Sequence, residues 1–185
     1  MNNQIPPQLN LPDMRLQPIR NGSRGIVFRI ADRCAAKVRY EGDCFKNIDE
    51  FSIDNDDNAH QKLIYEYTIA KELYKKNISV PTPISVKPLR LFLFPETKYP
   101  AFFMSYVPYP TGAELSYTDN SRALILVKKE VSKAVDLGFY PGKDHTNPNN
   151  YHYDRVGDRI ILIDFEFWES DTLENIFKDE VEEFS

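Results

Sequence analysis

Short apolar runs alternate with turn-forming residues in the first part of the chain, between positions 15 and 40. The runs have the sequences RLQPI, GIVFRI and CAAKVRY, and the segments NGSRG and ADR separate them. Runs of this length between glycine- and aspartate-containing segments are typical of strands joined by tight turns. The pattern therefore predicts an antiparallel β-meander over residues 15–40.

The spacing of apolar residues becomes helical after position 58. Leu63, Tyr67, Ala70 and Tyr74 recur at intervals of three or four residues, which predicts a helix over 59–76 with Asn77 at its end. The segment PTP at 81–83 then enforces extended backbone. Strand-like runs follow at 84–94 and 100–107.

A second helix is predicted over 121–137. Asp119, Asn120 or Ser121 can provide its N-cap, and Gly138 follows its end, where a left-handed residue often terminates a helix. Further along, the tail after Glu166 predicts a short amphipathic helix. Its inward-facing residues would be Leu173, Ile176, Phe177 and Val181.

This order of strands, helix, strands, linker and helix predicts an α+β fold with two lobes. Residues 1–14, rich in proline and asparagine, are expected to form an extended leader. The first lobe would span 15–104 and the second 113–185, joined by a linker at 105–112 that contains PYPTG. An acidic surface insert at 41–58, with seven acids and one lysine, interrupts the first lobe.

Composition and charge narrow the classes of function. Hydrophobic residues make up 42% of the chain and aromatic residues 13%, which argues against wholesale disorder. The net charge is −5, so we expect no nucleic-acid binding. Long apolar runs and a basic leader are both lacking, and Cys34 and Cys44 do not suggest a secreted disulfide framework. We therefore expect a soluble cytoplasmic protein with free thiols and no membrane contact.

Candidate chemistry begins in the meander. Gly22 and Gly25 can free backbone N–H groups for a phosphate, although a simple hairpin turn is the plainer interpretation. Lys37, in an apolar strand, needs an anion unless it lies on the solvent face of an edge strand. Glu66 shares the inward stripe of the first predicted helix and is the candidate partner, or else a surface residue.

A second group of polar residues follows the second predicted helix. Asp144 and Asn149 lie five positions apart on a proline-containing loop, and Asp164 ends the apolar strand IILID. A carboxylate at the mouth of a buried strand can hold a divalent cation, and an asparagine amide oxygen can be a second ligand. Each residue can also be a turn or cap residue. His60, His145 and His152 lack the spacing of a zinc site.

Six segments in chain order resemble motifs of the protein-kinase-like superfamily. GSRGIV resembles the second half of the glycine-rich loop, CAAK resembles V-A-I-K, and Glu66 resembles the glutamate of the family's regulatory helix. FMSYV resembles a gatekeeper and hinge, DHTNPN the D-x-x-x-x-N catalytic loop, and IDFE the D-F-G motif. The departures are Arg20 at the first loop glycine, Gly142-Lys143 before Asp144, and Glu166 in place of the last glycine of D-F-G.

The resemblance implies a minimal atypical kinase, similar to RIO- and Bud32-type kinases, with a sheet-based N-lobe at 15–104, a hinge at 105–112 and a reduced, mostly helical C-lobe. Its cofactors would be ATP and Mg²⁺, and its activity that of a serine/threonine protein kinase. Lys37, oriented by Glu66, would contact the ATP phosphates, Asp144 would be the catalytic base, and Asn149 and Asp164 would hold Mg²⁺. The nucleotide would also contact Gly22, Ser23, Gly25, Val27, Ala35, Met104, Ser105, Tyr106 and Val107.

Two other functions stay open. A pseudokinase would keep the fold, with or without nucleotide binding, but act by contacting a protein partner. A small-molecule kinase would use the same polar residues on another acceptor. The acidic insert could bind a basic protein partner, or Ser52 within it could be autophosphorylated, although a solvated loop is the simpler interpretation.

Overall fold

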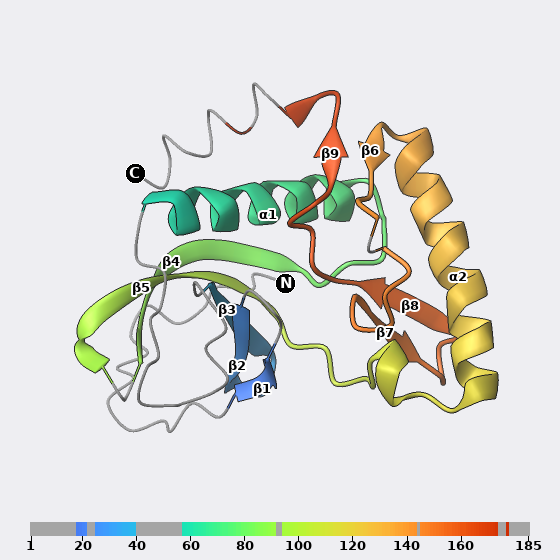
Figure 1. Ribbon diagram of the computed structural model, residues 1–185, viewed down its shortest axis with the longest axis horizontal. Coiled ribbons are helices and arrows are strands. Elements are labelled where there is room, and N and C mark those ends of the chain that lie inside the picture. Colours follow the sequence, from blue (N-terminus) through green and yellow to red (C-terminus); the bar gives the residue numbers. More distant parts are fainter. Residues whose placement is uncertain are drawn as a thin grey trace.

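Five antiparallel strands form the main sheet of the protein (Figure 1). The computed structural model describes residues 18–21, 25–39, 57–91, 94–143, 145–173 and 177. The strands are β1 (Pro18–Asn21), β2 (Gly25–Ala31), β3 (Cys34–Arg39), β4 (Pro83–Leu91) and β5 (Phe94–Ser105). Their order across the sheet is β1-β2-β3-β5-β4. The predicted meander is confirmed, because β1 pairs with β2 and β2 with β3 in antiparallel register.

Strand β3 lies in the interior of this sheet. It pairs with β2 on one side and β5 on the other, and Lys37 is opposite Val27 and Phe102. The alternative that places Lys37 on an edge strand is therefore wrong. Alternate residues of a strand share one face, so Ala36 and Val38 face one side while Lys37 and Arg39 face the other. Ala36 and Val38 belong to an apolar cluster with residues of β2, β4 and β5.

Helix α1 (Asp57–Lys75) packs against β4 and β5 on the face of the sheet that carries Lys37 (Figure 1). Its apolar stripe joins Val86 and Phe102 of the sheet in the larger hydrophobic cluster. Tyr67 meets Phe102 edge to face, with ring centroids 5.8 Å apart. After the helix, Asn77 adopts a left-handed φ of 60°, a conformation that asparagine tolerates better than most residues.

Helix α2 (Tyr117–Asp136) starts earlier than the sequence predicts. Its N-cap is Ser116, whose hydroxyl accepts a hydrogen bond from the backbone N–H of Asp119, so the three predicted caps at 119–121 are wrong. Ser116 was overlooked because the polar run after it continues for several residues, and any of them could cap a helix. Gly138 follows the helix with a φ of 81°, as predicted.

Four short strands complete the described part of the chain. They are β6 (Phe139–Tyr140), β7 (Tyr151–Asp154), β8 (Arg159–Leu162) and β9 (Glu169–Ser170), and a 3-10 turn, η2 (Gly112–Glu114), precedes α2. Strand β7 pairs with β8, and β6 pairs with β9. In Figure 1 these elements and α2 lie beside α1, on the opposite side of the molecule from the end of the sheet where β4 leads into β5. The predicted α+β class is confirmed: the main sheet carries α1, and the rest of the described chain contains α2, η2 and four short strands.

Several predictions fall outside the described residues. These are the leader at 1–14, most of the acidic insert, Gly22 and Ser23 of the glycine turn, and Asp144. Most of the predicted tail helix also falls there. Within the described part of the tail, Glu169 and Ser170 form β9 and Leu173 is buried. Neither α1 nor α2, the helices of the described part, combines the length and apolarity needed to cross a membrane.

Candidate functional site

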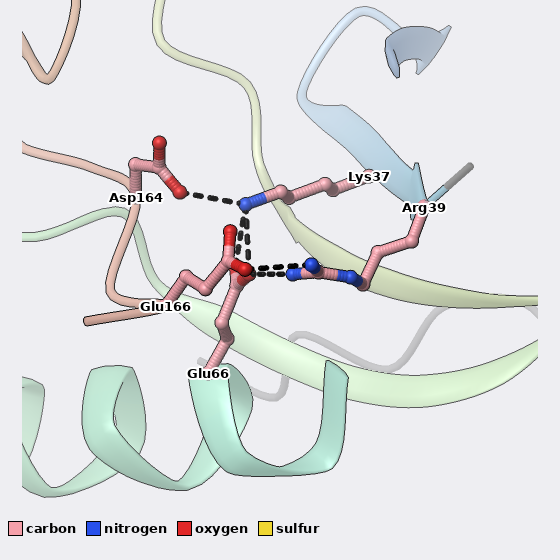
Figure 2. A network of polar contacts seen from close by, with 5 residues as sticks. All are labelled: Lys37, Arg39, Glu66, Asp164 and Glu166. Atoms are coloured by element: carbon pink, nitrogen blue, oxygen red, sulfur yellow. Dashed lines mark hydrogen bonds and ion pairs between the residues drawn. The ribbon is translucent and has the colours of Figure 1, made fainter. Parts of the chain in front are cut away.

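The ammonium group of Lys37 is the centre of a network of charged side chains (Figure 2). Its Nζ lies 2.8 Å and 2.7 Å from the two carboxylate oxygens of Glu66, and 2.8 Å from Oδ1 of Asp164. The side chain is only 12% exposed. A buried ammonium is costly without anionic partners, and the structure supplies two of them. Three segments far apart in the sequence, β3, α1 and the chain after β8, therefore meet at one nitrogen atom.

Glu66 reaches Lys37 because of its position on α1. It lies on the stripe that faces the sheet, between Leu63 and Ile69, and its side chain is 1% exposed. Burial raises the pKa of Glu66, and the charges of Lys37 and Arg39 counteract this effect. Burial alone would lower the pKa of Lys37, but Glu66 and Asp164 outweigh it and the pKa rises above its ordinary value. The proton of the pair therefore stays on Lys37.

Asp164 follows directly after β8 and Ile163, with a left-handed φ of 66°. Non-glycine residues seldom adopt this conformation, and it is found more often at binding and catalytic sites than elsewhere. The side chain is 42% exposed, so it is open to solvent on one side of the network. The next residue, Phe165, is buried and packs edge to face against Trp168, which anchors the backbone on either side of the turn.

Two charged residues that the sequence-based prediction missed complete the network. Arg39 donates from Nη1 to Glu66 at 3.1 Å and from Nη2 to Oε1 of Glu166 at 2.7 Å. Lys37 is thus not a lone cation in an apolar strand, because Arg39 is a second buried cation on the same face. Strand periodicity was the signal that could have identified it: residues 37 and 39 must point the same way. Glu166 had been noted only as a departure from D-F-G.

Oxygen atoms of Glu66, Asp164 and Glu166 lie within 4.8 Å of one another. This grouping could hold a metal ion by distance alone. Lys37 and Arg39, however, already bind these carboxylates directly, and the two cations offset most of the negative charge. Of the three, Asp164 has the most exposed side chain and is the best placed to bind an added cation.

The predicted loop lies next to Asp164. The backbone N–H of Ile163 donates to the carbonyl of Asn150 at 2.9 Å. Asn149 precedes the acceptor residue and Asp164 follows the donor residue, so this hydrogen bond brings their backbones close together. Asn147 shapes the loop, since its side-chain oxygen accepts from the N–H of Asn149 at 3.0 Å. A small cavity lies between this loop and the segment after Asp164. Its lining includes Gly142, His145, Asn150, Asp164, Phe167 and Trp168.

His145 contacts the backbone of its own loop. Its ring Nδ1 lies 3.0 Å from the carbonyl oxygen of Gly142, three residues earlier. Gly142 in turn must be glycine, because an added Cβ would come within 2.6 Å of the Cβ of Phe167. The loop is thereby packed against the chain that follows Asp164.

The predicted hinge begins where β5 ends. Met104 is opposite Ala35 of β3, and the N–H of Ser105 donates to the carbonyl of Thr82 at 2.9 Å. The N–H of Tyr106 donates to the carbonyl of Arg33 at 3.0 Å. The amides of residues 105 and 106 are thus engaged within the fold. The next residue is Val107. Within the described part of the chain, its N–H donates no backbone hydrogen bond.

Gly25 and Val27 place β2 against the strand that carries Lys37. A Cβ on Gly25 would lie 2.9 Å from the carbonyl oxygen of Val38 and 3.4 Å from Cε of Lys37. Only glycine therefore allows this close approach of β2 to β3. Val27 is opposite Lys37, and Ala35 lies two residues before it, so all three side chains share one face of the sheet. On this face the short side chains of Val27 and Ala35 lie next to Lys37, and Arg39 follows two residues further along the strand.

Comparison with known proteins bears on the fold. No family model and no curated protein sequence matches the chain. Among solved structures, the Rio2 kinase from Chaetomium thermophilum, in an ADP/Mg²⁺-phosphoaspartate complex, is similar with a TM-score of 0.56 and 18% identity. The similarity covers 88% of this chain and 51% of that one.

A second similar structure is that of monomeric WbdD, with a TM-score of 0.54 and 14% identity over 86% of this chain and 37% of that one. Another WbdD crystal structure gives a TM-score of 0.51 at 13% identity. The chain thus spans about half the length of the Rio2 kinase and less of WbdD. At these identities the comparison establishes architecture only. The chain has a protein-kinase-like fold.

Proposed function

We propose that the protein is an ATP-dependent phosphotransferase. The observation that carries the proposal is the contact of Lys37 with both the helix carboxylate of Glu66 and the strand-ending carboxylate of Asp164. Phosphoryl transfer depends mainly on positioning and on neutralising charge. The buried ammonium of Lys37 can neutralise charge on phosphate oxygens. The partly exposed carboxylate of Asp164 can position a divalent cation.

The residues present fit ATP and Mg²⁺. The ammonium of Lys37 would bind phosphate oxygens, while Glu66 holds it in place. Asp164 and Asn149 offer the oxygen ligands that Mg²⁺ prefers. The bound metal would neutralise charge on the phosphates. In the same proposal Gly25, Val27, Ala35 and the hinge would contact the nucleoside, with Gly22 and Ser23 near its phosphates.

The hinge geometry supports a nucleobase contact at one position. Because Ser105 and Tyr106 use their N–H groups within the fold, Val107 is the residue whose N–H can donate to a base. Met104, just before, would border the same pocket.

For the acceptor, we propose a serine or threonine hydroxyl of a protein. Asp144, the proposed base, would orient this hydroxyl and accept its proton. The alternative acceptor is the hydroxyl of a small molecule, which needs the same base and the same cation site.

A nucleotide-binding module without transfer activity is the second candidate. Two departures from the kinase motifs favour it: Gly142-Lys143 precedes Asp144, and Glu166 replaces the last glycine of D-F-G. In such a pseudokinase the fold would bind nucleotide or a protein partner, and no phosphate would be transferred.

One experiment separates these functions. The protein is incubated with labelled ATP and Mg²⁺, together with protein or small-molecule acceptors, beside Lys37→Ala and Asp164→Asn. We expect transfer by the wild type and its loss in both variants. Thermal stabilisation by ATP without transfer would favour the nucleotide-binding module. If the wild type shows no phosphate transfer and ATP does not stabilise it, the proposed nucleotide site is contradicted.

A further inference from the structure

Arg39 and Glu166 form a buried ion pair that links β3 to the chain after Asp164. The Nη2–Oε1 distance is 2.7 Å, and the two side chains are only 5% and 11% exposed. The same guanidinium also binds Glu66 through Nη1. A planar guanidinium can hold two carboxylates in fixed directions, which a single ammonium does less well. Arg39 therefore connects the helix carboxylate of Glu66 to the carboxylate of Glu166, which lies 127 positions after Arg39.

This pair is the neighbour of the Lys37–Asp164 pair. Arg39 lies two residues after Lys37 on one strand face, and Glu166 lies two residues after Asp164 (Figure 2). Two cations of β3 thus hold two carboxylates of one short segment. We propose that Arg39 and Glu166 are positioning residues that set Asp164 in register with Lys37, so that the phosphate and Mg²⁺ groups are assembled before a ligand binds. This inference rests on the proposed function.

The segment that carries Asp164 needs such an attachment. Asp164 has a left-handed backbone, and its own side chain is the most exposed member of the network. On the other side of the turn, the hydroxyl of Tyr65 donates to the carbonyl of Trp168 at 2.6 Å. Tyr65 ties the segment to α1, whereas Glu166 ties it to the sheet. The position of Asp164 relative to Lys37, a sheet residue, depends on the second attachment.

Repulsion among three neighbouring carboxylates is a second reason to assign a positioning role to Arg39. The oxygens of Glu66, Asp164 and Glu166 lie within 4.8 Å of one another. Without Arg39, the carboxylate of Glu166 would repel the other two and compete with them for Lys37. Arg39 binds Glu166 and offsets its charge, while Lys37 binds Glu66 and Asp164. Neighbouring residues that orient a metal ligand typically affect metal affinity by about 10- to 100-fold.

The test uses Arg39→Met, Glu166→Gln and the double variant, with ATP and Mg²⁺ as the probe. Calorimetry measures ATP binding over a range of Mg²⁺ concentrations, and urea unfolding measures stability. We expect each variant to need about 10- to 100-fold more Mg²⁺ for half-maximal ATP binding. The double variant leaves no unpaired charge of this pair, so its stability should recover toward that of the wild type while its Mg²⁺ requirement stays high.

Hydrogen exchange gives a readout without any ligand. Peptides covering residues 164–170 should exchange faster in Glu166→Gln than in the wild type, while peptides of α2 should not change. Arg122→Met is the matched control, because it removes an arginine–carboxylate pair between α2 and the β7–β8 turn, outside the network. Its Mg²⁺ requirement and its exchange at 164–170 should equal those of the wild type.

The outcomes separate this inference from the proposed function. If the wild type does not bind ATP with Mg²⁺, the proposed function fails and the inference fails with it. If the wild type binds and the double variant regains both stability and the normal Mg²⁺ requirement, only the inference is overturned, because the pair then contributes stability alone. An unchanged Mg²⁺ requirement in a folded Glu166→Gln variant would overturn it as well.

Discussion

Two aspartates, one on each side of β8, share an unusual backbone conformation but differ in their surroundings. Asp158 has a φ of 44° and Asp164 a φ of 66°. Both accept hydrogen bonds from a cationic side chain: Arg122 Nε lies 3.0 Å from Asp158, and Lys37 Nζ lies 2.8 Å from Asp164. Backbone and distance therefore do not distinguish them.

Burial of the partner does distinguish them. Asp158 belongs to the turn between β7 and β8, where left-handed aspartate is common, and its arginine is 51% exposed. Asp164 lies outside any hairpin turn, and its lysine is buried with Glu66. Water can replace either member of the first pair, but it cannot replace the carboxylates around Lys37. Burial of Lys37 therefore requires its carboxylate partners, whereas the exposed Arg122 does not require Asp158.

The largest expected effect is on the stability of the buried network. Glu66→Ala leaves two buried cations with fewer partners, so we expect it to lower the free energy of unfolding by about 3–5 kcal/mol. Arg122→Ala removes an exposed pair, so its free energy of unfolding should stay close to that of the wild type. Urea unfolding of both variants checks the contrast. Equal losses would show that burial does not separate the two regions.

A smaller effect is expected from the backbone of the two aspartates. Left-handed backbone costs a residue with a Cβ about 1–2 kcal/mol, and glycine avoids this cost. The glycine variant at each position should therefore be more stable than the alanine variant by about 1–2 kcal/mol. Both glycine variants should fold, but only Asp164→Gly should lose Mg²⁺-dependent binding of ATP. Thermal unfolding with and without Mg²⁺ and ATP measures both properties. Retained Mg²⁺-dependent binding in Asp164→Gly would remove the functional distinction between the two aspartates.

The smallest expected effect appears at alkaline pH. Although burial opposes it, Glu66 and Asp164 raise the pKa of Lys37 above its ordinary value of 10.5. The folded state then keeps a proton that the unfolded chain loses. The resulting stabilisation is fully present below pH 10.5 and is lost as the pH rises through the folded-state pKa.

Lys37→Met removes this contribution, so the stability difference between wild type and variant should shrink as the pH rises above 10.5. Urea unfolding across this range measures it. Lys75→Met, which removes an exposed pair with Glu72, serves as the control. A difference that grows with pH would contradict the assigned direction of the shift.

Much of the fold could be predicted from the sequence because its signals are local. The β-meander followed from short apolar runs and turns, and α1 from the spacing of Leu63 and its neighbours. The start of α2 could not be predicted, since several adjacent residues can cap a helix and packing selects Ser116. Asp144, on which the proposed chemistry depends, lies outside the described residues, so its role stays a prediction.

The amino-acid order supplies a strand lysine, a helix glutamate and an aspartate at the end of an apolar strand. Their meeting at one nitrogen atom, and the addition of Arg39 and Glu166, could be seen in the folded protein alone. Local periodicity sets which face of an element a side chain occupies, whereas contacts between residues 127 positions apart depend on how sheet, helix and strand end pack together.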